Sequence, residues 1–223
     1  MTTGLPGNGW PLSLRGKPLA TIDDLRSRIL NELKRPGLTS EADLAIADAV
    51  AFYSTYRFWF SEETHTFTTV ADTASYSLPS DFRDWVKLEI IVGSQRWDLG
   101  CPWTYQEYRD AALDTVLERG QPTNWAIWES SLYLYPAPDG VYSLPMAYIE
   151  AIGVPAAGEE NAWTTHAEPL IRTHAKIDLL TNVIRDMSGE AERLEPQRLR
   201  WLGHLQRRTQ AMGRPNRVTP SSW

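Results

Sequence analysis

The sequence contains one cysteine, four histidines and no long apolar run, and each shortage argues against a class of protein. A single cysteine, Cys101, cannot form an intrachain disulfide or a multi-cysteine zinc site. We expect it to be a small, half-buried residue after a hairpin. No apolar stretch reaches the roughly 18 residues of a membrane-spanning helix. The first ten residues lack the basic and apolar blocks of a secretory signal, so no membrane partner is expected.

Signature motifs of catalysis and phosphate binding are also missing. The sequence has no glycine-rich phosphate loop, no Gly-x-Ser-x-Gly elbow and no His-Glu-x-x-His helix. His166 and His174 are eight residues apart, roughly 12 Å along a helix, which is too far to share a metal ion. Glu107 and Asp139 could each act as an acid or base, but neither has a paired group. We therefore predict no catalytic residue, no cofactor and no metal.

Aromatic residues are abundant instead, with ten tryptophans, nine tyrosines and five phenylalanines among 223 residues. They are dense in residues 120–150, which predict a meander of three strands at 125–128, 132–135 and 142–150. Bulky strands of this kind either carry a ligand platform or simply fill a core. The residues expected on the core face are Ile127, Leu132, Leu134, Leu144 and Met146.

Helical signals lie on both sides of this region. Residues 21–24, Thr-Ile-Asp-Asp, combine an N-cap hydroxyl with first-turn acids and predict a helix start. A second helix is expected from Ser40 to about Trp59. Capping-box patterns predict two further starts, at Thr104 and at Thr165. A last helix is expected over about 190–212.

Alternating polarity predicts two hairpins between the second helix and Thr104. Residues 64–70 and 75–78 flank one turn, and residues 85–92 and 95–99 flank another. The helix from Thr104 is expected to end near residues 119–120.

The order of these elements predicts an α+β fold. Helices from the two ends of the sequence form one helical bundle, and an antiparallel β-rich domain is inserted between them. Glycine and proline punctuate both ends, which predicts extended N- and C-terminal arms. The expected segments are an N-terminal extended arm at 1–18, the first half of the helical domain at 19–61, an inserted β-rich domain with one helix at 62–152, the second half of the helical domain at 153–212, and a C-terminal tail at 213–223.

The net charge of −6 hides an uneven distribution. Residues 62–160 hold 16 acidic and 5 basic side chains, whereas the remainder holds 12 acidic and 17 basic ones. Solvated helix faces explain some of this division, and a basic docking surface is the alternative. The C-terminal region is rich in arginine: Arg193, Arg198, Arg200, Arg207, Arg208, Arg214 and Arg217.

Six short segments carry a resemblance to a known family, none of them catalytic. The segments are Thr21-Ile-Asp-Asp-Leu-Arg26, Tyr56-Arg-Phe-Trp-Phe60, Tyr76-Ser-Leu-Pro-Ser-Asp-Phe82, Gly120-Gln-Pro-Thr-Asn-Trp-Ala-Ile127, Leu132-Tyr-Leu-Tyr-Pro-Ala-Pro-Asp139 and Asn161-Ala-Trp-Thr-Thr165. In their order and spacing, from about Thr21 to Arg214, the chain resembles the head-to-tail adaptor (connector) proteins of tailed bacteriophages.

The resemblance implies a structural virion protein and not an enzyme. Such adaptors form a ring, commonly of twelve copies, between the portal protein and a downstream tail or nozzle protein, at the head–tail junction of a virion assembled in the host cytoplasm. Genome DNA passes through the lumen without sequence-specific binding.

The two arms are the expected contacts with the portal or with neighbouring subunits, because each carries apolar side chains that a free tail would not need. The residues expected to make these contacts are Trp10, Leu12 and Leu14 in the N-terminal arm, and Arg214, Pro215, Arg217, Val218 and Trp223 in the tail.

The alternative function is a carbohydrate-binding module that uses the tryptophan- and tyrosine-rich β domain. Pairs such as Trp125 and Trp128 could stack on sugar rings. The long flanking helices argue against this interpretation.

Overall fold

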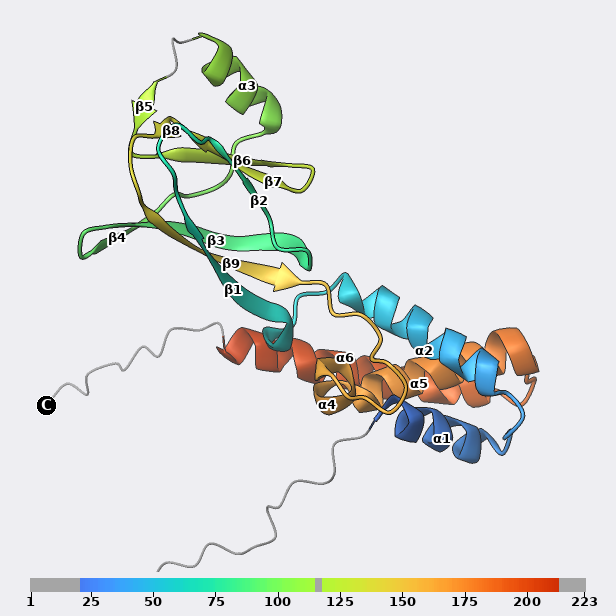
Figure 1. Ribbon diagram of the computed structural model, residues 1–223. Coiled ribbons are helices and arrows are strands. Elements are labelled where there is room, and N and C mark those ends of the chain that lie inside the picture. Colours follow the sequence, from blue (N-terminus) through green and yellow to red (C-terminus); the bar gives the residue numbers. More distant parts are fainter. Residues whose placement is uncertain (1–20, 115–117, 213–223) are drawn as a thin grey trace, which may run out of the picture. The chain divides into compact units, whose positions relative to one another are not determined.

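The computed structural model describes residues 21–114 and 118–212, which form two compact units (Figure 1). A helical unit contains residues 21–49 and 154–198, and a β-rich unit contains residues 50–153 and 199–212. Helices α2 (Thr39–Ser54) and α6 (Glu190–Met212) each contribute to both units. The predicted α+β class is confirmed, whereas the finer division into five segments stays a prediction.

The helical unit begins with α1 (Ile22–Leu33), which starts where the sequence predicts, at the N-cap residue Thr21. The Thr21 hydroxyl accepts from the Asp24 backbone N–H at 3.2 Å, and the Asp24 carboxylate accepts from the Thr21 N–H at 3.1 Å. This reciprocal pair satisfies two donors that a helix start would leave unbonded. Leu25 and Ile29 then bury one face of α1 completely or nearly so.

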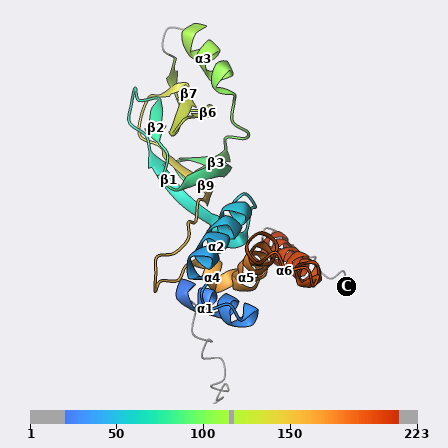
Figure 2. The same cartoon turned by 90° about the vertical axis from the view of Figure 1, so that its right-hand side faces the viewer.

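Helix α1 lies along α5 (Glu168–Asp178), as Figure 2 shows from the side. Glu32 accepts from Arg172 at 2.8 Å and from Lys176 at 2.9 Å, and Arg28 pairs with Glu168 at 3.4 Å. Residue numbers rise together in these pairs, so the two helices run parallel. Helices from the two ends of the sequence therefore share one core, as predicted.

The helix predicted to start at Thr165 starts earlier and is divided into three pieces. Asn161, and not Thr165, caps α4 (Ala162–His166), because its side-chain oxygen accepts from the Trp163 N–H at 2.9 Å. Helix α5 follows, and a π-helical segment η3 (Leu179–Ile184) ends at Arg185 in the left-handed conformation. The helical segment consequently ends before Met187, whose side chain is 97% exposed.

The β-rich unit contains two antiparallel sheets and a short parallel pair (Figure 1). The four-stranded sheet has the order β1 (Glu62–Thr68), β9 (Ser143–Glu150), β3 (Phe82–Val92), β4 (Gln95–Asp98). The three-stranded sheet has the order β2 (Ser75–Ser77), β7 (Ser131–Tyr135), β6 (Asn124–Trp128). Strands β5 (Arg119–Gly120) and β8 (Ala137–Pro138) pair in parallel, and the short helices are α3 (Tyr105–Asp114) and η2 (Trp59–Ser61).

The core of this unit contains the residues that the alternation of the strands predicts. Leu132 and Leu134 on β7, and Leu144 and Met146 on β9, are fully buried in one apolar cluster. Ile127 packs against the cluster but is only partly buried. Trp125 is also fully buried, where its ring meets that of Trp85 edge to face at 5.3 Å.

Two predicted strand pairings are wrong, although the strands themselves exist. Strand β1 pairs with β9 and not with β2, and the third strand of the expected meander lies in the other sheet. Local alternation defines a strand, but its partner depends on which pairing completes the buried face. The hairpins β3–β4 and β6–β7 are confirmed, because a short turn joins each pair directly.

Several boundaries also differ from the sequence predictions. Helix α2 ends at Ser54 and not near Trp59, and α3 reaches only Asp114. Cys101 is exposed and not half-buried. Within the described ranges, no helix combines the length and the apolar character that crossing a bilayer requires.

The edge strand β4 carries charged side chains that pair with those of β3. Glu89 accepts from Lys87 at 2.6 Å and from Arg96 at 3.1 Å, and Lys87 also lies 3.6 Å from Asp98. All four residues of β4 are exposed. The outer edge of the sheet is therefore short and covered with charge.

Truncation of Leu134 tests the core between the two sheets. Because this side chain is fully buried, Leu134→Ala should destabilise the protein by about 2–5 kcal/mol. Denaturant unfolding measures the difference. Val141→Ala, at a residue 75% exposed, is the control and should change stability by less than about 0.5 kcal/mol. Equal effects of the two substitutions would contradict this description of the core.

Candidate assembly surfaces

The aromatic residues of the β-rich unit hold α3 against β6 and β7. The rings of Tyr105 and Trp128 stack at 4.8 Å with an interplanar angle of 9°, and Tyr108 meets Tyr133 at 5.1 Å. Trp125 and Trp128 are an odd number of positions apart on β6, so they project from opposite faces. Trp125 is buried and Trp128 is 48% exposed, so the pair cannot form one sugar-stacking platform.

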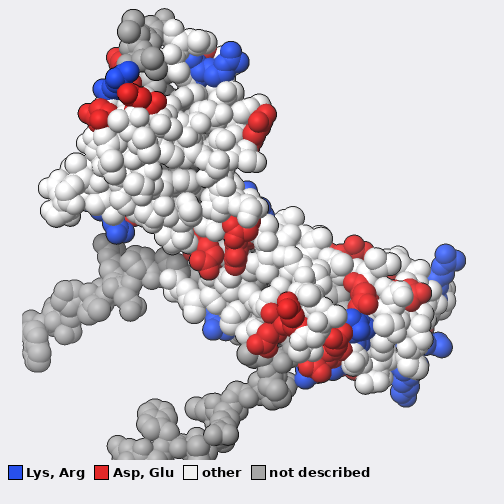
Figure 3. Space-filling model, viewed as in Figure 1, with Lys and Arg blue, Asp and Glu red and all other residues white. Residues whose placement is uncertain are grey.

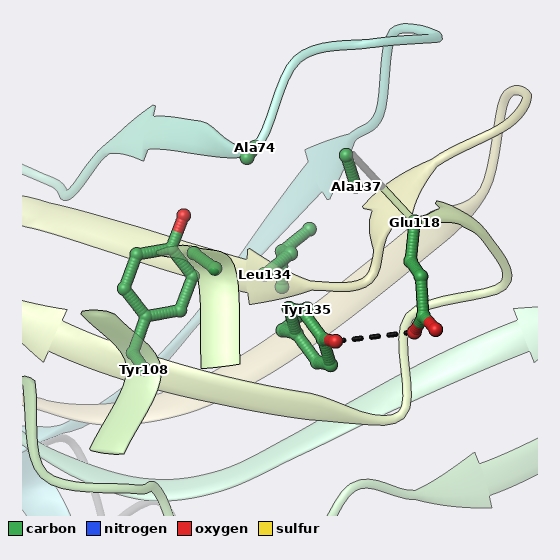
Figure 4. A pocket seen from close by; sticks show the side chains of 7 residues that line it. Ala74, Tyr108, Glu118, Leu134, Tyr135 and Ala137 are labelled. Atoms are coloured by element: carbon green, nitrogen blue, oxygen red, sulfur yellow. Dashed lines mark hydrogen bonds between the residues drawn. The ribbon is translucent and has the colours of Figure 1, made fainter. Parts of the chain in front are cut away.

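A pocket lies between α3 and the strands β7 and β8 (Figure 4). Its polar groups are Tyr108, Tyr135 and Glu118, and the Tyr135 hydroxyl donates to the Glu118 carboxylate at 3.1 Å. Burial raises the pKa of Tyr108 above its ordinary value. The one carboxylate among the described lining residues is therefore already hydrogen-bonded.

The two residues considered as acid or base have structural roles. The Glu107 carboxylate accepts from the N–H and the hydroxyl of Thr104 at 2.7 and 2.8 Å, which caps α3 and lowers the Glu107 pKa. The Asp139 carboxylate accepts from the Tyr142 hydroxyl at 2.6 Å. No cluster of three possible metal ligands occurs among the residues that the structure describes.

Helix α6 attaches one face of its C-terminal half to η2. The Thr209 hydroxyl accepts from the Trp59 backbone N–H at 3.2 Å, and the Arg208 guanidinium lies 4.2 Å from the centre of the Trp59 ring. Leu205 is buried one turn earlier. These contacts fix which side of the helix faces its own β-rich unit.

The opposite side of α6 carries an arginine stripe, defined here as Arg200, His204 and Arg207. Each residue advances an α-helix by about 100°, so Arg200 and Arg207 point about 140–180° away from Leu205 and Thr209. All three side chains are exposed. Within residues 21–114 and 118–212, neither arginine forms an ion pair. No acidic residue occurs from Pro196 to the end of the sequence.

Acidic side chains gather at one end of the four-stranded sheet, where β1 and β3 begin and β9 ends (Figure 3). We call this group the carboxylate end. It comprises Glu62, Glu63, Asp81, Asp84 and Glu150. Arg57 pairs with Glu62 at 2.9 Å, and Arg83 donates to the Tyr56 carbonyl.

The pKa values at this end record the mutual repulsion of the carboxylates. Burial, then Glu63 and Asp81, raise the pKa of Glu150. Burial and a hydrogen bond to Asp81 at 3.1 Å, with Glu150 and Glu63 nearby, raise the pKa of Tyr148 to about 12. Among the described residues, the charged groups that act on Glu150 are both negative.

The contact residues predicted in the two arms lie outside the described residues: Trp10, Leu12, Leu14, Arg214, Pro215, Arg217, Val218 and Trp223. The sequence does not point to the carboxylate end, because its members come from three strands that are far apart along the chain. The surplus of acids between residues 62 and 160 is the one signal that could have suggested it.

The described residues thus form an aromatic-packed α+β fold with two oppositely charged surfaces. The chain belongs to the SU10 adaptor protein family, whose model matches residues 20–220. The resemblance to bacteriophage head-to-tail adaptors is thereby confirmed, and the protein is a structural adaptor of a phage virion. No curated protein matches the chain significantly.

Replacement of Glu150 tests the repulsion at the carboxylate end. Its raised pKa means that the folded state disfavours the ionised form of Glu150. The protonated side chain therefore contributes to the free energy of unfolding below the ordinary carboxyl pKa, and this contribution is lost as the pH rises through the raised value. Glutamine is never ionised. Glu150→Gln should therefore raise the melting temperature at pH 7, and the gain should disappear below about pH 4.

Thermal unfolding followed by circular dichroism at both pH values measures this gain. Glu160→Gln, at an exposed carboxylate, is the control and should leave the melting temperature unchanged. A Glu150→Gln variant that is less stable than the parent at pH 7 would contradict the assignment.

Proposed function

We propose that this adaptor forms a ring of twelve copies below the portal protein and joins the capsid to the tail. The ring occupies the head–tail junction of a virion assembled in the host cytoplasm, and genome DNA passes through its lumen. The observation that carries the proposal is the match to the SU10 adaptor protein family over residues 20–220, nearly the whole chain.

The charge of the chain supports passage of DNA without sequence-specific binding. A net charge of −6, with an excess of acids between residues 62 and 160, disfavours tight contact with phosphates. The arginines on α6 form one exposed stripe along a helix. A duplex could therefore move past most of the surface without being held.

We propose that the two arms supply contacts beyond the folded units. The N-terminal arm, with Trp10, Leu12 and Leu14, and the tail, with Arg214, Arg217 and Trp223, dock on the portal or on a neighbouring subunit. A downstream tail or nozzle protein binds the other side of the ring. The carbohydrate-binding alternative loses its support, because Trp125 is buried in the core.

Native mass spectrometry and electron microscopy test the ring. The full chain, alone or mixed with its portal protein, should give a closed ring whose mass corresponds to twelve copies. A protein that stays monomeric under both conditions would refute the proposed function. Rings of another number would refute only the stoichiometry.

A truncation after Met212 tests the role of the tail. Loss of residues 213–223 should weaken binding to the portal by about tenfold or more, because it removes two arginines and an aromatic anchor. Portal pull-down with quantitative densitometry measures the change. Full-strength binding by the truncated chain would show that the tail is not the contact.

A matched variant separates the two arms. Trp10→Ala combined with Leu12→Ala leaves the tail intact and removes apolar side chains from the N-terminal arm. If both variants bind the portal normally, neither arm is the portal contact.

A further inference from the structure

The arginine stripe of α6 and the carboxylate end of the β-rich unit have opposite charges. Arg200 and Arg207 form no ion pair within the described residues, and the described charged groups that act on Glu150, Glu63 and Asp81, are acidic. At the same end Arg57 pairs with Glu62 and Arg83 lies beside Asp84, so the surplus negative charge is that of Glu63, Asp81 and Glu150. Surface charges of this kind are usually solvated, but these two surfaces are complementary in sign.

The arginine stripe lies on the side of α6 that faces away from η2. The face of α6 that contacts the β-rich unit carries Leu205, Arg208 and Thr209, through the bonds to Trp59. Arg200 and Arg207 point away from that face, by the geometry of the helix. The stripe is therefore directed outward, toward whatever lies beside the subunit.

A closed ring requires two different surfaces on each copy that fit one another, because its interfaces are heterologous. This requirement rests on the proposed function. The stripe and the carboxylate end are two such surfaces. Arg200 and Arg207 are about 10 Å apart along the helix, so each can bind a separate carboxylate. Planar guanidinium groups also suit carboxylates, since they can donate two parallel hydrogen bonds.

We propose that the arginine stripe of one copy docks on the carboxylate end of a neighbouring copy and forms the electrostatic component of the contact between subunits. The occupant of each surface is therefore a second copy of this chain. The register places Glu63 and Glu150 on the same face of the sheet, because Glu63 is opposite Tyr148 and Glu150 follows Tyr148 by two residues. Glu63 is exposed and Glu150 is half-buried, and these are the carboxylates that would meet the arginines.

The contact would relieve a cost that the isolated subunit carries. In the free chain, burial and the nearby Glu63 and Asp81 raise the Glu150 pKa, and none of the described charged groups that act on it is basic. An incoming arginine favours the ionised form of Glu150. Docking should thus lower the Glu150 pKa, and assembly should weaken as the pH falls toward the carboxyl range.

Charge reversal with rescue tests the contact in the full chain. Arg200→Glu combined with Arg207→Glu should weaken subunit association about tenfold or more, because like charges then face one another. Glu63→Lys combined with Glu150→Lys, which share one face of the sheet, should have a similar effect. The quadruple variant, which exchanges the two signs, should regain ring formation.

The matched control is Arg35→Glu combined with Arg109→Glu. These exposed arginines also form no ion pair within the described ranges, and the substitution changes the net charge equally. It should assemble like the parent protein. Melting temperatures of all variants establish that they are folded, and native mass spectrometry or sedimentation on the portal measures ring formation.

The outcomes separate this contact from the proposed function. If the parent protein forms rings and the stripe variant assembles as well as the control, the contact is wrong and the ring stands. If the stripe variant assembles but loses portal binding or DNA retention, the occupant is the portal or DNA, and the contact is equally refuted. A parent protein that never forms a ring refutes the proposed function itself.

Discussion

The pairing of β9 with both β1 and β3 is the interaction on which the β-rich unit depends. Strand β9 lies in the middle of the four-stranded sheet and turns Leu144, Met146 and Tyr148 toward the buried cluster. It is also the last strand before the chain returns to the helical unit. Loss of its register would expose the apolar face and separate the carboxylates at its end.

Local chemistry predicted most elements of this fold. Thr21 with Asp24 and Thr104 with Glu107 formed the expected caps, because a capping box needs only residues three positions apart. The buried positions of β7 and β9 followed from alternation. In both confirmed hairpins, a short turn brings the two strands side by side.

Long-range pairing could not be predicted in the same way. Nothing in residues 62–68 shows that they pair with residues 143–150, since the choice depends on which arrangement buries Phe67 and Leu144 together. Asn161, and not Thr165, caps the helix, because both residues have a side chain suited to an N-cap and the sequence alone does not choose between them. The carboxylate end could not be predicted for the same reason, because its side chains come together only when the three strands are paired.

The charged edge strand β4 limits the addition of other strands to the sheet. An exposed flat strand would invite other chains to extend the sheet. Lys87, Glu89, Arg96 and Asp98 form a charged ladder along this short edge, so an added strand would have to break or bury several ion pairs. Fibre-like growth through this edge is thereby discouraged, and contacts between copies are left to side chains.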